Sequence, residues 1–246
     1  MKADHFDQQK LLALAAEDVA LAQLAHRKRT LPENAAVETA SDTEREFAAA
    51  VVHAETAVRD LQREVKRLEG DVETVRQRAA KDQKLLDSGS VNPKQMTDLQ
   101  HELQSLARRQ SDLEDQELEL MEQLETAEAA LARAQEGQQE AQAQKERAEQ
   151  LRDDALADIA DGTTTHDAAR SDAAARIPAD LLKLYERIRT QTGATGAAML
   201  KARQCQGCRI ELNGRELAAV RNADPHEVVR CENCGRILVR TAESGL

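Results

Sequence analysis

The sequence predicts a mainly α-helical protein, built as a long antiparallel coiled-coil hairpin followed by a small C-terminal module that holds four cysteines. Three observations favour this class. Of the 246 residues, 1% are aromatic and 32% are charged. A globular enzyme of this length normally builds its large core with more aromatic residues and fewer charged ones. Apolar residues recur at spacings of three and four over long stretches, as in a coiled coil. All four cysteines fall in two Cys-x-x-Cys pairs near the end of the chain.

Two heptad patterns predict the two helices of the hairpin, over residues 44–86 and 96–159. At about 1.5 Å per residue, these helices are roughly 65 and 95 Å long. Polar Gln110 and Glu117 in the second seam mark either a docking site or positions that fix the register of the coil. The first seam contains Phe47, Val51, Ala54, Val58, Leu61, Val65, Leu68, Val72, Val75, Ala79 and Leu86, with Asp82 as an exception. The second contains Met96, Leu99, Leu103, Leu106, Leu113, Leu120, Leu124, Ala127, Leu131 and Ala134.

Residues 87–93 carry the signals of the hairpin tip. Gly89 can end the first helix in the left-handed conformation. Asn92 can cap the second helix, with Pro93 in its first turn and Gln95 reaching back to the cap. We therefore expect the two long helices to be antiparallel neighbours.

Shorter segments complete the helical part. An apolar face over residues 4–28 predicts a helix that packs on the basal part of the longer helix. Gly162 with the three Thr residues after it predicts the end of the long helix and the start of a short Ala-rich one. A further helix is expected over residues 179–188, followed by a hinge at residues 192–196.

These signals divide the chain into three predicted parts. The hairpin spans residues 1–176, a helical connector and hinge spans residues 177–200, and the cysteine module spans residues 201–246. No stretch reaches the roughly 20 apolar residues that cross a bilayer, and the first residues lack the pattern of a secretory signal. We expect a cytoplasmic protein.

The cysteine module matches a zinc ribbon with one structural Zn²⁺. Its expected ligands are Cys205, Cys208, Cys231 and Cys234. Two residues between paired cysteines let one tight turn present both sulfurs to a tetrahedral ion, and Gly207 and Gly235 permit that turn. Four thiolates complete the tetrahedral site and leave no open position for a catalytic water. His226 is therefore not expected to be a ligand. A thioredoxin-like redox site would normally have one Cys-x-x-Cys pair in a βαβ setting, which this sequence lacks, so redox catalysis is not expected.

Short β-prone segments flank both cysteine pairs. They cover residues 209–212, 228–230 and 237–240. Strands around two metal-binding turns are the expected layout of a ribbon, so the predicted fold is a helical hairpin with a small ribbon of short β-strands.

Charge is distributed unevenly along the chain. The net charge is −11, yet residues 178–246 carry 11 Lys plus Arg and 8 Asp plus Glu, or +3, which leaves −14 for residues 1–177. The basic residues of the module either contact a phosphate backbone or compensate the negative zinc-thiolate centre. They are Lys201, Arg203, Arg209, Arg215, Arg221, Arg230, Arg236 and Arg240. No aromatic residue follows Tyr185, so any nucleic-acid binding is expected to be electrostatic.

Together, these motifs resemble the bacterial C4-type zinc-ribbon family with an N-terminal coiled-coil hairpin. The resemblance rests on the tip Leu86-Asp-Ser-Gly-Ser-Val-Asn-Pro93, on Leu184-Tyr-Glu-Arg187 after Ile177-Pro178, and on Cys231-Glu-Asn-Cys-Gly-Arg-Ile-Leu238. It implies a non-enzymatic adaptor, with some relatives tied to transcription, messenger RNA or secretion machinery. Members often close the last strand with an aromatic residue, where Val239 stands here, which argues against a stacking role.

Two functional hypotheses follow. In the first, a cytoplasmic adaptor contacts DNA or RNA, or a nucleic-acid machine, through its ribbon while the hairpin binds a protein partner. In the second, the chain is a protein-only scaffold or chaperone-like adaptor with a structural ribbon. Catalysis is not expected, because no Gly-rich phosphate loop, nucleophile elbow or open metal site is found. The oligomeric state stays open.

Overall fold

The computed structural model describes all 246 residues. The elements are α1 (His5–Arg29), α2 (Glu33–Asp87), α3 (Pro93–Ala175), α4 (Ala179–Thr192), β1 (Ala197–Lys201), β2 (Gln204–Cys205), α5 (Gly214–Asn222), β3 (Ile237–Val239) and a 3-10 turn at Ala242–Ser244. The chain forms two compact units. The hairpin unit is Glu33–Gln150, and the base unit combines Met1–Pro32 with Leu151–Leu246. The predicted part boundaries near residues 176 and 200 stay a prediction.

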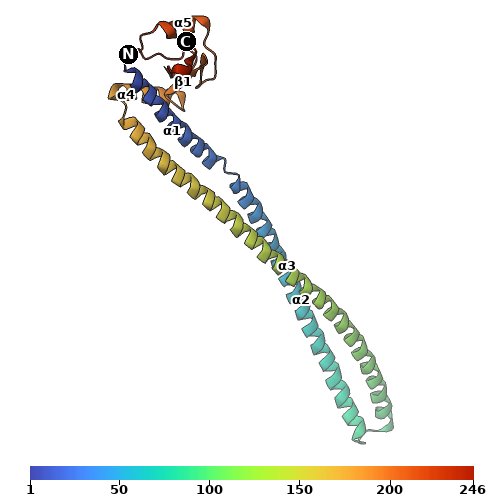
Figure 1. Cartoon of the computed structure of the whole chain (residues 1–246). Coiled ribbons are helices and arrows are strands. Elements are labelled where there is room, and N and C mark those ends of the chain that lie inside the picture. Colours follow the sequence, from blue (N-terminus) through green and yellow to red (C-terminus); the bar gives the residue numbers. More distant parts are fainter. The chain divides into compact units, whose positions relative to one another are not determined.

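The hairpin unit is the antiparallel coiled coil that the heptads predict, with α2 and the first part of α3 side by side (Figure 1). Leu68, Val72 and Leu113 form a buried cluster in its seam. Arg76 pairs with Glu114 across the two helices at 2.7 Å. Helix α2 begins earlier than the predicted residue 44, because its first turns are rich in Ala and carry no large seam residue that the pattern could detect.

The hairpin tip has the predicted caps. The Asn92 side chain accepts a hydrogen bond from the Gln95 backbone N–H at 2.9 Å, and the Gln95 side chain accepts one from the Asn92 N–H at 3.0 Å. Gly89 has a φ of +66°, in the left-handed region. A reciprocal cap of this kind satisfies two backbone donors that the start of a helix otherwise leaves unpaired.

No helix of the structure has both the length and the apolar character needed to cross a membrane.

Helix α3 does not end at Gly162, so that prediction was wrong. The helix continues to Ala175. The hydroxyls of Thr163, Thr164 and Thr165 each donate to the carbonyl four residues earlier, at 2.7, 3.0 and 3.0 Å. They therefore remain inside the helix instead of capping a new one. Gly162 fits because Leu24 of α1 packs close to its Cα, in the space a side chain would need.

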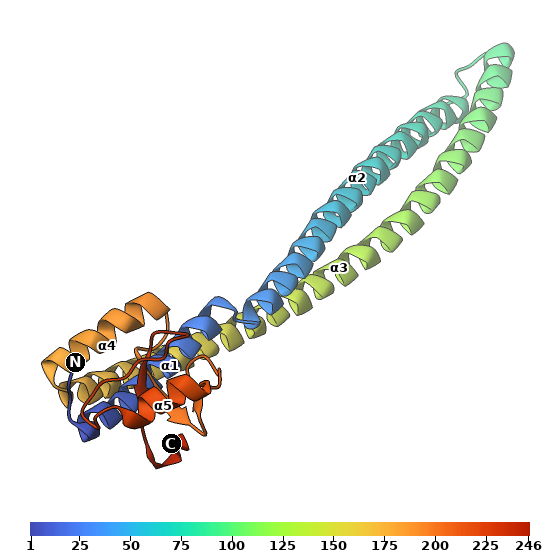
Figure 2. The same cartoon turned by 90° about the horizontal axis from the view of Figure 1, so that it is seen from above.

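The core of the base unit lies where α1, α4 and the end of α3 meet the strands (Figure 2). Its fully buried members include Leu11, Tyr185 and Ile237. A second cluster joins Leu24 of α1, and Leu31 just after it, to Ala155 and Ile159 of α3, which confirms that the first helix packs on the basal part of the long one. Gly196 lies against Tyr185 so closely that a Cβ would collide with the Tyr185 backbone.

The sheet has the order β2-β1-β3, with β1 antiparallel to β2 and parallel to β3. The strand predicted at 237–240 is present. The strands predicted at 209–212 and 228–230 are wrong, because these segments make only isolated bridges, at Glu211 and Arg230. Residues 226–228 pair instead with the start of the chain, where Ala3 N–H donates to the His226 carbonyl at 2.7 Å. Helix α5 has no counterpart among the predicted elements.

Candidate metal centre

The two Cys-x-x-Cys turns of the base unit have the same backbone geometry. The Arg209 N–H donates to the Cys205 carbonyl at 2.7 Å, and the Gly235 N–H donates to the Cys231 carbonyl at 2.8 Å. Gly235 has a φ of +74° and Arg209 a φ of +60°. Arg209, and not Gly207 as the sequence suggested, is thus the left-handed residue of the first turn. That conformation costs a residue with a side chain about 1–2 kcal/mol.

The turns bring all four sulfurs together. The Sγ atoms of Cys205, Cys208, Cys231 and Cys234 lie within 4.8 Å of one another. The Sγ atoms of Cys205 and Cys234 are 3.8 Å apart, and those of Cys208 and Cys231 are 3.9 Å apart. Four sulfurs placed tetrahedrally at about 2.3 Å from Zn²⁺ are separated by roughly 3.8 Å. The residues therefore fit a tetrahedral zinc-binding site.

Burial makes this site unfavourable for bare thiolates. It raises the pKa of the Cys205 thiol to about 12, and it also raises the pKa of Cys231. At Cys234, burial again acts to raise the pKa, but hydrogen bonds from Arg236, together with those of Cys231 and Cys205, outweigh it and lower the pKa to about 7. A divalent cation stabilises all four thiolates and so offsets the cost of burying them.

His226 lies with the N-terminal segment and not with the sulfurs. Its ring Nδ1 is 3.9 Å from a carboxylate oxygen of Asp4, and its carbonyl accepts the Ala3 N–H. The convergent donor group contains cysteines alone.

Several of the eight predicted basic residues of the ribbon have structural contacts inside the base unit. The Arg240 guanidinium donates to five backbone carbonyls, those of Val220, Ala223, Asp224, Pro225 and Glu227. It thereby ties α5 to the loop that precedes the second cysteine pair. Such buried or semi-buried carbonyls need donors of this kind.

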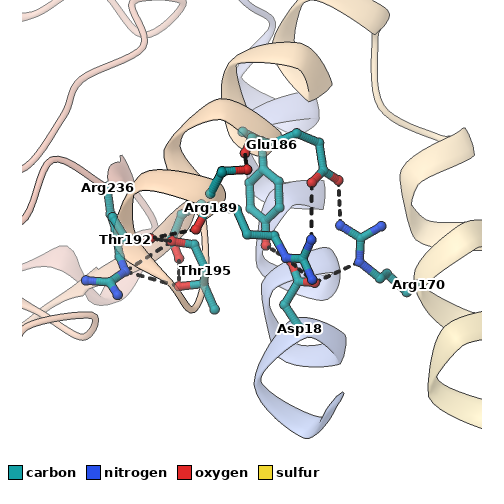
Figure 3. Close-up of polar contacts among 10 residues, drawn as sticks. Asp18, Arg170, Glu186, Arg189, Thr192, Thr195 and Arg236 are labelled. Carbon is teal, nitrogen blue, oxygen red and sulfur yellow. Dashed lines mark hydrogen bonds and ion pairs between the residues drawn. The ribbon is translucent and has the colours of Figure 1, made fainter. Parts of the chain in front are cut away.

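Four more of these residues also have partners within the chain. Arg236 Nε donates to the carbonyl and hydroxyl oxygens of Thr195, both at 3.2 Å (Figure 3). Arg230 donates to the Gly235 carbonyl at 2.8 Å. Arg203 donates to the Gly245 carbonyl at 3.3 Å, and Lys201 pairs with Glu243 at 2.7 Å. The side chains of Arg209, Arg215 and Arg221 are exposed and make no hydrogen bond or ion pair in the structure.

A buried ionic cluster lies beside the ribbon, at the junction of α1, α3 and α4 (Figure 3). The Asp18 side chain is 0% exposed, accepts a hydrogen bond from Arg170 Nε at 2.7 Å and forms an ion pair with Arg189 Nε at 2.8 Å. It also accepts the Tyr185 hydroxyl at 2.5 Å. Glu186 pairs with Arg170 at 2.5 Å on the outer side. One carboxylate from α1 thus connects the other two helices.

The cluster raises the pKa of two of its members, Tyr185 and Arg170. Burial and the hydrogen bond to Asp18 raise the pKa of Tyr185 far above its usual range. Burial acts to lower the pKa of Arg170, but the hydrogen bonds to Asp18 and Glu186 raise it overall. Each donor of the cluster faces an acceptor, and no group in it is positioned as a nucleophile. The cluster therefore joins the helices through charge-assisted hydrogen bonds.

Comparison with known proteins identifies both parts of the chain. The CT398-like coiled coil hairpin domain matches residues 14–193, and the C4-type zinc ribbon domain matches residues 204–238. The chain belongs to the CT398-like coiled-coil hairpin family. The resemblance predicted from the tip and cysteine motifs is therefore confirmed.

Relatives within this CT398-like family extend over the whole chain. An uncharacterized protein of Mycobacterium tuberculosis is 39% identical over 240 residues, 98% of each chain. A structure from Mycobacterium smegmatis has a TM-score of 0.84 at 34% identity and covers 98% of this chain and 100% of its own. CT398 of Chlamydia trachomatis, at 19% identity and a TM-score of 0.63, covers 95% of this chain and 97% of its own, and shares the fold.

Sequence reasoning found the cysteines but missed the Asp18 cluster. The missed signal was present, because Asp18 continues the spacing of Leu11 and Leu14 and precedes Leu21 on the apolar face of α1. An acid at a core position needs a buried partner. The partner arginines lie more than 150 residues further along the chain, so no local pattern links them to Asp18.

Proposed function

We propose that this protein is a non-enzymatic cytoplasmic adaptor whose hairpin unit binds a protein partner and whose ribbon is a structural module with one Zn²⁺. The observation that carries the proposal is the surface of the hairpin unit. Its seam is filled by its own two helices, yet Leu118 and Met121 of α3 remain outside the seam, at 60% and 50% exposure. Exposed apolar groups that lie next to each other on an otherwise charged coil offer contact area to a protein partner.

The internal contacts of the ribbon support the structural assignment. Arg230, Arg236 and Arg240 bond to carbonyl oxygens of the base unit. These hydrogen bonds stabilise the module, and Arg236 in addition lowers the pKa of Cys234, which supports the compensation alternative raised by the sequence. A protein-only adaptor needs no further role for them.

Crosslinking of the zinc-loaded full chain in nuclease-treated lysate tests this proposal. We expect a reproducible partner protein crosslinked to lysines of the hairpin unit, such as Lys66, Lys81 and Lys94. The nuclease removes proteins that are held only by nucleic acid. Partner crosslinks confined to Lys201 of the ribbon, or partners lost after nuclease treatment, would contradict the proposal.

A second candidate is nucleic-acid binding by the ribbon, and one observation favours it. Arg209, Arg215 and Arg221 are exposed and have no partner within the chain. Arginines of this kind can contact phosphates without reading the bases.

Fluorescence anisotropy with single-stranded RNA and double-stranded DNA tests this second candidate. If the ribbon binds phosphates, affinity falls steeply as salt rises, and replacing Arg209, Arg215 and Arg221 together by Ala weakens it. The matched control replaces Lys66, Arg67 and Lys81 of the hairpin unit, which changes the net charge equally. An equal loss of nucleic-acid affinity in both triple variants, or no binding at low salt, would rule out this candidate.

A further inference from the structure

One stretch of α3 in the hairpin unit has an extreme charge pattern. Residues 112–128 contain eight acidic residues and no basic one. Six of them follow one another at helical spacings of three and four, and all six side chains are exposed. We call these six the acidic stripe: Asp112, Asp115, Glu119, Glu122, Glu125 and Glu128.

The acidic stripe has no cation within the chain. Among the eight acids of this stretch, Glu114 alone forms an ion pair, with Arg76 of α2. Like charges three and four residues apart repel each other and destabilise a helix. The stripe therefore retains an uncompensated repulsion that a cationic partner would relieve.

An exposed apolar pair lies beside the acidic stripe. Leu118 is 60% exposed and Met121 is 50% exposed. At helical spacing, Leu118 neighbours Asp115 and Glu122, and Met121 neighbours Glu125. The two apolar side chains are thus bordered by carboxylates, while Leu113 of the same helix is buried in the seam.

We propose that this face of α3, the acidic stripe with Leu118 and Met121, binds a basic amphipathic helix of the partner protein. Apolar side chains of that helix would cover Leu118 and Met121, and its Lys or Arg residues would pair with the stripe. The inference rests on the proposed function and specifies the chemistry of the partner. A phosphate backbone is repelled by this face, and a second copy would bring acid against acid.

A synthetic amphipathic peptide with Leu along one face and Lys on both sides is the probe. Calorimetric titration of the zinc-loaded full chain should show binding that weakens with salt. L118Q with M121Q should weaken it about tenfold, and D115N with E122Q and E125Q should weaken it by a similar factor. A scrambled peptide of the same composition should bind more weakly than the amphipathic one.

Two matched controls separate this face from general effects. V52Q removes an equally exposed apolar side chain from α2, and E55Q with E64Q and E69Q makes the same charge change on that helix. The affinity of both control variants for the peptide should stay within about twofold of that of the natural chain. Absence of peptide binding, or equal losses in stripe and control variants, would overturn the proposal, as would a self-association that L118Q with M121Q abolishes.

The crosslinking experiment distinguishes failure of this inference from failure of the proposed function. If the L118Q/M121Q chain still crosslinks the partner through the hairpin lysines as strongly as the natural chain does, the adaptor function stands and this face is rejected. If the natural chain captures no partner through the hairpin, the adaptor function itself is rejected.

Discussion

Replacing Asp18 by Ala is expected to lower the free energy of unfolding of the base unit by about 3 kcal/mol. The Asp18 carboxylate is fully buried, and the substitution leaves the Arg170 guanidinium, 20% exposed, without its main partner. The buried Tyr185 hydroxyl also loses its acceptor. Removing one member of a buried network costs more than the network contributes overall, because the remaining groups stay desolvated.

Tyr185 itself provides the measurement for this prediction. It is the only tyrosine, and the chain has no tryptophan, so its fluorescence during denaturant unfolding reports on the base unit. Asp18→Asn keeps the shape and should show a smaller loss. The control is Asp167→Ala, an exposed residue of α3 in the same unit, which should change stability by no more than about 0.5 kcal/mol. An unchanged midpoint for Asp18→Ala would mean that water already solvates the arginines.

The local features of the hairpin could be predicted because short-range physics determines them. The heptad spacing gave the seam that buries Val58, Leu68 and Leu113, and Asn92 with Gln95 gave the cap at the tip. The cysteine spacing gave the convergent thiols for a similar reason, since each pair is one local turn.

The missed features all depend on contacts between distant segments. Helix α3 continues through Gly162, where Leu24 of α1 packs, and the segment at 226–228 pairs with the start of the chain. The sequence left open whether the basic residues contact a phosphate backbone or compensate the zinc centre, and Arg240 donates to carbonyls that its own sequence neighbourhood does not reveal. Tertiary contacts of this kind override propensity and spacing.

Loss of zinc is expected to unfold the ribbon while the hairpin unit keeps its helices. The ribbon's own core is small, a single cluster around Leu200, Leu212 and Leu238. A core of this size supplies only about 3–5 kcal/mol, whereas Zn²⁺ bound by four thiolates contributes about 10–16 kcal/mol in small zinc modules. The free energy of zinc binding exceeds that of core packing by a factor of about three, so packing alone should not keep the ribbon folded.

Cys234→Ser tests this expectation with the least disturbance of packing, because Cys234 is only partly buried whereas Cys205 is fully buried. The variant should bind no zinc, against one ion per natural chain, and amide exchange in β1 and β3 should accelerate while helical circular dichroism is nearly retained. Asn233→Ser changes the neighbouring exposed residue, which supplies no sulfur, and should leave zinc binding and exchange unchanged. If the strands stay protected in Cys234→Ser, the contacts of Ile237 and Val239 with the helical core suffice to fold the ribbon, and the metal is accessory to it.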